Sequence, residues 1–237
     1  MNENYQLGIS QTFPCSYLPD QQERLLIAVD ERLQDTEHYG WLMSQGFRRS
    51  GDQIYRPHCI NCQACQSLRV VANEFIPTKS QKRLIKKNHT LTINIQTEIQ
   101  DSYYPLYEKY INEVHQDGAM FPANHSQYQS FLSGKLTKQL FLEIWHDKTL
   151  INVAVTDELT DALSAVYTFF DPEFGSKRSL GVFAVMWQIE AAVSQNLEYV
   201  YPGFWIKDCR KMNYKSNYQP IEGLIKGKWV SLEKCTK

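Results

Sequence analysis

The chain has 237 residues, 43% of them hydrophobic, so it is long enough to bury a sizeable core in one large or two small domains. Its formal net charge of −1 excludes a nucleic-acid partner held by overall charge, and any such partner must bind a local basic patch. No apolar run approaches the roughly 20 residues of a membrane-spanning helix, so no membrane partner is expected. Six cysteines without a secretory pattern at the start predict a reducing compartment and a cytoplasmic location.

The first elements in chain order are two helices and a hairpin. Residues 20–23 form a capping-box pattern, which predicts a helix that continues over 25–33 with leucines and valine on one face. A second helix is predicted over 36–45 and should end at Gly46. Residues 47–56 carry the turn Ser-Gly-Asp between two short strand-like segments, which predicts a hairpin.

Three cysteines follow the hairpin at equal spacing, Cys59, Cys62 and Cys65, so one turn can aim all three sulfurs at a single point. The spacing matches the opening of an iron–sulfur run, although the fourth position of that run is Arg69, and it also suits a zinc knuckle. Three clustered thiols cannot pair without leaving one over, which disfavours disulfides. The run therefore predicts a metal site, with reduced structural or vestigial thiols as the alternative.

A strand predicted over 68–75 leads into the most charged segment of the chain, which opens with a second capping box at 78–81. Five cations recur at helical spacing and should share one face: Lys79, Lys82, Arg83, Lys86 and Lys87. No acidic residue interleaves, so the cations repel one another unless a polyanion lies opposite. The face predicts an anion-binding surface, and the alternative is an ordinary solvated helix.

The rest of the chain is predicted to alternate between helical and strand-like segments. In chain order these are a strand over 91–99, helices over 101–116 and 125–132, and an antiparallel meander over 141–145, 150–155 and 163–170. A polar loop over 171–179, a helix over 181–195, a strand over 198–201 and a last strand over 227–230 complete the series. Pro202 removes a donor from the strand ladder, so that strand should bend or end there. Cys209 and Cys235 match no motif spacing and are predicted to be free thiols.

The loop over 171–179 would deliver free backbone N–H groups at a helix N-terminus, a place that binds phosphate or a carbonyl oxygen. Meander, loop, helix and strand in this order resemble the acetyl-CoA-dependent N-acetyltransferase (GNAT) superfamily. Residues 178–181 carry only half of that superfamily's phosphate-binding signature, which disfavours CoA as the donor. The predicted fold class is α+β. A cysteine-containing α/β region over 1–100 should pack onto a GNAT-like acyltransferase region over 101–237, a mixed sheet with helices.

Several motifs resemble the aminoacyl-tRNA–protein transferase family. They lie at 14–19, 46–51, 55–65 and 77–83 in the amino-terminal half, and at 170–172, 179–181, 199–201, 205–206 and 211–215 in the carboxyl-terminal half. The compact length and the C-x2-C-x2-C form resemble the bacterial aspartate/glutamate leucyltransferase branch, which is related to the eukaryotic arginyltransferases.

The resemblance implies a reaction in which the α-amine of a protein beginning with Asp or Glu attacks the ester carbonyl of an aminoacyl-tRNA. The bacterial branch implies Leu-tRNA as the donor. The product would be marked for degradation in the N-degron pathway, with a protease adaptor as a candidate downstream partner. The donor ester is already activated, so no cofactor is expected for the chemistry. The alternatives are an arginyl-tRNA–protein transferase, a CoA-dependent N-acetyltransferase and a non-catalytic metal-knuckle RNA-binding protein.

This reaction gives roles to candidate residues. Arg48, Arg49 and Arg56 are expected to read the acceptor carboxylate, because guanidinium groups pair with carboxylates through two hydrogen bonds; the alternative for each is a surface ion pair. Tyr17 is expected to bind the acceptor together with these arginines. The tRNA phosphates are assigned to the basic face over 79–87 together with Lys211 and Lys215.

The aminoacyl end is expected near four predicted catalytic residues: Asp171, Ser179, Leu180 and Gly181. Asp171 could take the amine proton, or it could merely cap a turn before Pro172. The resemblance also supplies Cys15 as a fourth ligand beside Cys59, Cys62 and Cys65. The four would hold zinc or an iron–sulfur cluster as a structural or redox-sensing clamp near the acceptor pocket.

Overall fold

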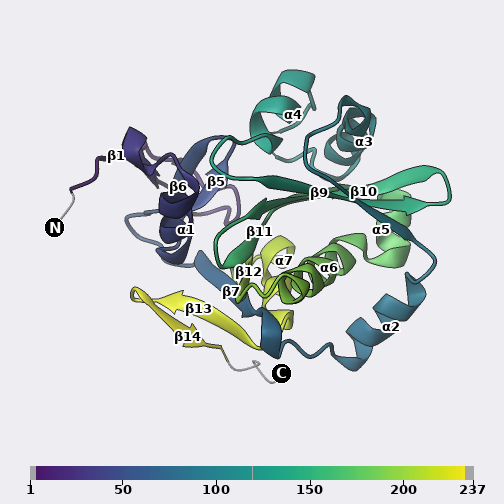
Figure 1. Ribbon diagram of the computed structural model, residues 1–237. Coiled ribbons are helices and arrows are strands. Elements are labelled where there is room, and N and C mark those ends of the chain that lie inside the picture. Colours follow the sequence, from purple (N-terminus) through teal and green to yellow (C-terminus); the bar gives the residue numbers. More distant parts are fainter. Residues whose placement is uncertain (1–3, 119, 233–237) are drawn as a thin grey trace.

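A large sheet runs through the computed structural model, which describes residues 4–118 and 120–232 (Figure 1). Its eight described strands have the order β14-β13-β7-β12-β11-β10-β9-β8. Their bounds are β7 Gln66–Val71, β8 Thr92–Gln96, β9 Gln139–His146, β10 Thr149–Glu158, β11 Ala162–Phe170, β12 Tyr199–Trp205, β13 Ile221–Ile225 and β14 Lys228–Ser231. The pairs are antiparallel except β11 with β12, which run parallel and pair only over Ala162, Leu163 and Ser164.

Helices cover both faces of this sheet, as Figure 1 shows. On one face lies α6 (Leu180–Ser194), whose Leu180 and Ala184 pack with Leu142 of β9. On the other face α3 (Tyr104–Val114) and α4 (His125–Leu132) pack on Phe141, the residue next to Leu142. Successive residues of a strand point to opposite faces, so β9 contributes to both cores.

A smaller sheet with the order β1-β4-β6-β5 lies beside it, formed by Leu7–Ile9, Leu25–Ala28, Gln53–Pro57 and Arg48–Ser50 in that order. A hairpin of β2 (Phe13–Pro14) and β3 (Gln22–Glu23) precedes β4. Helix α1 (Thr36–Ser44) is capped by Asp35 and buries Tyr39, Leu42 and Met43 against this sheet. Trp229 of β14 donates to the Ser44 carbonyl at 3.0 Å and joins the C-terminal hairpin to α1.

The remaining elements are short. They are the 3-10 helices η1 (Glu31–Leu33), η2 (Ala72–Glu74), η3 (Asp101–Tyr103) and η4 (Tyr214–Asn217), and the helices α2 (Lys79–Lys87), α5 (Pro172–Arg178) and α7 (Arg210–Asn213). No helix in the described ranges is long and apolar enough to cross a membrane.

The predicted helix over 25–33 is wrong. Residues 25–28 form β4, which pairs with both β1 and β6, and only η1 follows it. Leu26 and Ala28 are buried while their neighbours are more exposed, which is the period of a strand rather than of a helix. The capping-box residues Gln22 and Glu23 lie in β3 instead.

The predicted polar loop over 171–179 is also wrong, because most of it is α5. Asp171 accepts hydrogen bonds from Glu173 N and Phe174 N, and Pro172 occupies the first turn of the helix. Asp and Pro are favourable at these two positions, so the local signal was that of a helix start. The strand β13 was missed, and β12 continues to Trp205, four residues beyond its predicted end.

Most other elements are confirmed. The predicted α1, the β5–β6 hairpin, the meander and α6 are present within a few residues, and α4 has its predicted bounds. Helix α2 carries the predicted capping box, with Thr78 and Gln81 each accepting from the other's backbone N–H. The α+β class holds. The boundary at residue 100 stays a prediction, since β7 and β8 share one sheet with strands from beyond that position.

Candidate functional site

A cavity of about 100 Å³ lies where β11 and β12 diverge. The predicted bend of β12 is present, because its register against β7 shifts between Val200 and Gly203, around Pro202. The cavity is lined by residues from both sheets and the C-terminal turns: Tyr17, Tyr39, Arg48, Arg49, Tyr55, Ser164, Ala165, Val166, Pro202, Gly203, Phe204, Met212 and Lys215. None of these lining residues is an aspartate or glutamate.

Arg48, on β5, is buried and has no carboxylate partner among the described residues. Its guanidinium donates to the carbonyls of Phe47 at 2.5 Å and Leu68 at 3.3 Å, and it stacks over Tyr201 and Phe204. Its Nε is buried without a hydrogen-bond partner. Burial lowers the pKa of Arg48 to about 10, so it remains a cation at neutral pH. An uncompensated buried cation is costly, and an anionic ligand in the cavity would offset that cost.

Lys215, on η4, is partly buried beside the same cavity. Its Nζ contacts Met212 Sδ at 3.7 Å. A Cβ at position 203 would lie 3.0 Å from this Nζ, and Gly203 has a φ of +97°, so only glycine suits the position. Burial, followed by the charge of Arg48, lowers the pKa of Lys215 to about 8. Two positive groups therefore face one cavity without an acidic partner among its lining residues.

Arg49 differs from its neighbour in that every nitrogen of its guanidinium has an acceptor inside the protein. Nε and Nη2 donate to Asp157 at 2.6 and 2.8 Å, and both side chains are almost fully buried. The other N–H groups reach the carbonyls of Gly51, Ser133 and Leu132. This residue has no donor left for a substrate carboxylate, so its place in the structure is a bridge between the two sheets.

Arg56 and Tyr17, the other two predicted acceptor-binding residues, line different spaces. Arg56 donates to the Gln45 carbonyl at 3.0 Å, stacks over Phe47, and lines an open groove of about 460 Å³ instead of the Arg48 cavity. Tyr17 lines the Arg48 cavity itself, and burial raises the pKa of its phenol. Of the four predicted acceptor-binding residues, the structure therefore places Tyr17, Arg48 and Arg49 at one cavity, and of these two arginines Arg48 is the one without a carboxylate partner among the described residues.

Cys15, Cys59, Cys62 and Cys65 line a second, smaller cavity together with Tyr55 and Phe204, which also line the Arg48 cavity. All four are free thiols. Burial and then the neighbouring thiols of Cys15, Cys59 and Cys62 raise the pKa of Cys65 to about 12.

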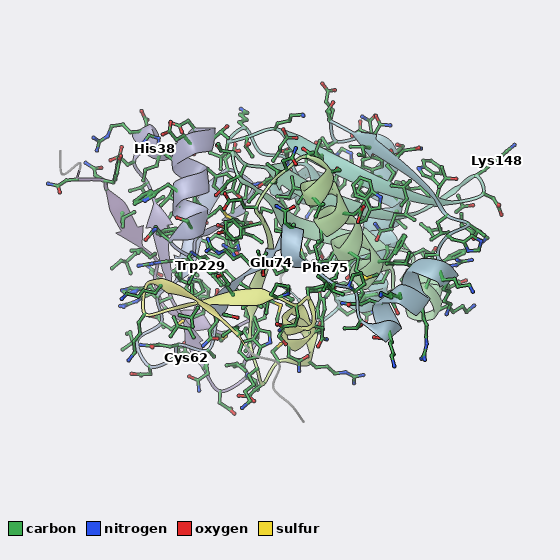
Figure 2. All side chains as sticks on the ribbon, turned by 60° about the horizontal axis from the view of Figure 1, so that its bottom comes forward. His38, Cys62, Glu74, Phe75, Lys148 and Trp229 are labelled. Atoms are coloured by element: carbon green, nitrogen blue, oxygen red, sulfur yellow. The ribbon has the colours of Figure 1, made fainter. Side chains whose placement is uncertain are left out.

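The described ranges contain no group of three or more His, Cys, Asp or Glu side chains already arranged to hold a metal ion. Figure 2 shows Cys62 at the edge of the molecule near the β13–β14 hairpin, whose residues 225–227 line the same groove. Cys209 is a buried free thiol, and Cys235 lies outside the described residues.

The five cations of α2 are all exposed or partly exposed, as their spacing predicts. The C-terminal end of α2 meets that of α5, where Asn88 Nδ2 donates to the Arg178 carbonyl at 3.0 Å and Arg178 donates to the Lys87 carbonyl at 3.3 Å. This contact adds Lys177 and Arg178 to the basic surface. The sequence offered a signal for it, because both lie in the last turn of a helix, where cations are favoured.

The other two predicted tRNA-binding lysines lie elsewhere. Lys211, on α7, is exposed and forms an ion pair with Asp117 at 2.8 Å. Lys215 faces the Arg48 cavity instead of standing on the α2 surface.

The four predicted catalytic residues do not line the Arg48 cavity. Asp171 caps α5 and accepts from Lys109 Nζ at 3.0 Å. Ser179 has a left-handed backbone with φ +49° at the junction of α5 and α6, Leu180 is buried in the core, and Gly181 follows in the first turn of α6. Ser179, Leu180 and Gly181 lie at the α5–α6 junction, and Asp171 begins α5. Asp171 thus has the helix-capping role that the sequence offered as the alternative to proton transfer.

Comparison with known proteins defines the class. Residues 13–83 match the family model described as "Arginine-tRNA-protein transferase, N terminus", and residues 102–225 match the one described as "Arginine-tRNA-protein transferase, C terminus". The chain is 50% identical to the aspartate/glutamate leucyltransferase of Pseudoalteromonas atlantica, over 96% of this chain and 97% of that protein. It is 47% identical to the enzyme of the same name from Pseudomonas fluorescens, over 94% and 95%.

The relative of that name from Aeromonas hydrophila is 44% identical over 96% of this chain and 95% of its own length. The chain therefore belongs to the aspartate/glutamate leucyltransferase family. Among solved structures, L-PGS from Bacillus licheniformis matches with a TM-score of 0.43 and 9% identity, covering 61% of this chain and just 46% of that one, which is too weak to carry an argument about fold.

Proposed function

We propose that this chain transfers leucine from Leu-tRNA to the N-terminal Asp or Glu of a protein. The names of its near full-length relatives support the reaction. The observation that carries the acceptor specificity is Arg48, a buried guanidinium without a carboxylate partner at the edge of a cavity. The side-chain carboxylate of the acceptor binds Arg48, and Tyr17 and Tyr55 close the wall around it. A charge-assisted pair inside a small cavity favours Asp and Glu over neutral first residues.

The donor tRNA binds through its phosphates to the cations of α2, extended by Lys177 and Arg178, with Lys211 as a further contact. The C-terminal region acts as a GNAT-like acyltransferase, a proposal supported by the succession of meander, α6 and β12 and by the short parallel pairing of β11 and β12. The α5–α6 junction, with Ser179, Leu180 and Gly181, faces the aminoacyl end of the tRNA.

The chemistry requires positioning more than chemical activation. Holding two reactants in a reactive geometry can lower a barrier by roughly 7–11 kcal/mol. The donor ester is already activated, and the acceptor α-amine has an ordinary pKa of about 7.7–8.0, so part of it is neutral at cell pH. No cofactor is needed for this reaction. The enzyme acts in the cytoplasm and marks its products for the N-degron pathway, where a protease adaptor would bind the new N-terminal leucine.

The cysteine cavity is proposed to hold zinc or an iron–sulfur cluster. The residue types support this, because four thiols line one cavity and thiolates are the usual ligands of both groups. Binding would have to draw these thiols together, since the described residues contain no group of three already arranged for a metal ion. Such a centre would fasten the segment around Cys15 to the turn over 59–65, beside the wall shared with the Arg48 cavity. Elemental analysis of anaerobically purified protein tests this. Near-stoichiometric zinc or iron that is lost in a Cys62→Ser variant is expected, and the absence of both metals from the unaltered protein would refute it.

The reaction is tested with labelled Leu-tRNA, Arg-tRNA or acetyl-CoA and peptides that begin with Asp, Glu, Lys or Ala. We expect addition of one leucine, detected by mass, onto the Asp and Glu peptides alone. Transfer from Arg-tRNA instead would establish the arginyltransferase alternative, and acetylation would establish the CoA-dependent one. Tight tRNA binding without any transfer would favour the non-catalytic RNA-binding alternative.

A further inference from the structure

Among the lysines that the structure describes, Lys215 is the one that lines the Arg48 cavity, and its surroundings differ from those of a phosphate contact. Its Nζ lies against the backbone of Gly203, next to the bend of β12, and has no ion-pair partner in the described part of the chain. The cavity, at about 100 Å³, has room for about one small residue and opens to solvent. The first residue of an acceptor polypeptide suits this space.

The titratable and charged groups around Lys215 come from several elements. Arg48 on β5 repels its charge, and the Cys209 thiol before α7 acts weakly in the opposite direction. The other ionisable residues that line the cavity are Tyr17, Tyr39, Tyr55 and Arg49. The charge of Arg49 is matched by Asp157, and burial raises the pKa of the phenols, so they stay neutral. An acceptor carboxylate bound by Arg48 brings the adjacent α-amine into the space that Lys215 also faces.

We propose that Lys215 is the catalytic base that takes the proton of the acceptor's α-ammonium group. This inference rests on the proposed leucyl transfer. The neutral Nζ accepts one proton, and the freed amine forms a C–N bond to the ester carbonyl carbon of Leu-tRNA. Collapse of the adduct breaks the bond to the ribose oxygen, which leaves with the second proton of the nitrogen, relayed by the neighbouring ribose hydroxyl. Lys215 then returns its proton to solvent.

The local electrostatics suit this role. With a pKa of about 8 instead of the ordinary 10.5, a useful fraction of Lys215 is neutral near physiological pH, which a surface lysine is not. Burial is the larger cause of this lowering and persists when Arg48 is paired with the acceptor carboxylate, whereas the charge of Arg48 adds to it before the acceptor binds.

The decisive variant is Lys215→Arg, which keeps the positive charge but cannot lose a proton at working pH. We expect kcat for an Asp-starting peptide to fall by about 10²–10⁴-fold, with the KM for Leu-tRNA unchanged. Lys215→Met should behave in the same way. The control is Lys148→Met, at the exposed β9–β10 turn far from the cavity (Figure 2). Wild-type kcat in folded Lys215→Arg would overturn the proposal, because a purely electrostatic contact tolerates arginine.

A second readout is chemical rescue of Lys215→Ala, whose fold is checked by circular dichroism. Ethylamine should restore leucylation of the peptide in proportion to the free-amine concentration, and direct attack of ethylamine on the donor is separated by the mass of its leucyl amide. The absence of rescue in folded protein would count against a proton-accepting role. If the unaltered chain transfers no leucine, the proposed function itself fails and this inference with it. If it transfers leucine while Lys215 variants are unimpaired, only the inference fails.

Discussion

Two regions of this molecule hold cations that have no acidic partner among residues 4–118 and 120–232, and they do so in opposite environments. The α2 surface presents its five cations to solvent, whereas the Arg48 cavity buries one guanidinium and one amine between two sheets. Exposed cations are strongly screened by salt and cost little to maintain, so they suit a long polyanion with many weak contacts. Buried cations are expensive and selective, so they suit one carboxylate in one orientation. In the proposed function, the exposed region binds the donor tRNA and the buried one recognises the acceptor.

The largest expected effect concerns Arg49, the neighbour of Arg48, which has a carboxylate partner in Asp157. Asp157→Ala removes the carboxylate of the buried Arg49 pair and the acceptor of the Tyr39 hydroxyl. Breaking such a pair by removing one partner should lower the free energy of unfolding by about 3–5 kcal/mol. Urea titration followed by circular dichroism measures this. A change below about 1 kcal/mol would show that Arg49 is not the structural member of the two arginines.

Arg48→Met tests the other arginine of this adjacent pair. The substitution keeps an apolar side chain but removes the guanidinium. The kcat/KM for an Asp-starting peptide should therefore fall, by an amount that corresponds to a loss of roughly 2–5 kcal/mol of binding energy. The free energy of unfolding should not fall, because the cation that is removed is buried without a carboxylate partner among the described residues, and an unpaired buried charge is costly. The KM for Leu-tRNA serves as the internal control and should not change. Equal use of Asp and Ala peptides by unaltered protein would remove the carboxylate-reading role.

The double change Lys82→Glu and Arg83→Glu tests the exposed region. Leu-tRNA binding should weaken, and the slope of log binding constant against log salt should become shallower by about 1–2, because up to two fewer phosphates are neutralised. The kcat and KM for Asp-starting peptides, measured at saturating Leu-tRNA, should stay unchanged. Fluorescence anisotropy at several salt concentrations provides the slope, and an unchanged slope would remove α2 from the donor site.

The last expected effect is the pH dependence of stability due to Lys215. Its pKa is about 8 in the folded protein and 10.5 when unperturbed, so between these values the unfolded chain binds more protons and stability rises with pH. Lys215→Met should therefore be more stable than the unaltered protein at pH 7, and this advantage should shrink as pH rises from about 8 to 10.5. Melting temperatures of both proteins across this range check the sign. An advantage that does not depend on pH would place Lys215 in solvent.

Local sequence signals predicted several elements well because the interactions that form them are local. The capping box of α2 links Thr78 with Gln81 within one turn, and the spacing of five cations fixes their common face. The equal spacing of Cys59, Cys62 and Cys65 likewise brings three thiols to one cavity. By contrast, β4 resembled a helix in sequence and became a strand, because pairing with β1 and β6 on both sides outweighed its local preference.

The residue types of the candidate site were predictable from the sequence, but the different environments of its members were not. Nothing in the adjacent pair Arg48 and Arg49 distinguishes them in sequence, and their side chains leave β5 on opposite faces. The partner that neutralises Arg49 lies 108 residues away, and Arg48 has none among the described residues. Lys215 was predicted with Lys211 to bind tRNA phosphates, and only the packing of η4 against Gly203 placed it at the cavity.

The sequence by itself indicated the family, through motifs spread along the chain. It also determined the basic face of α2, the clustering of Cys59, Cys62 and Cys65 and the bend of β12 at Pro202, since each of these depends on covalent geometry or on neighbours within a few residues. The tertiary structure alone decided which cations are compensated, which are buried, and which share a cavity. Those properties arise from desolvation and long-range pairing, which act between segments that are distant along the chain.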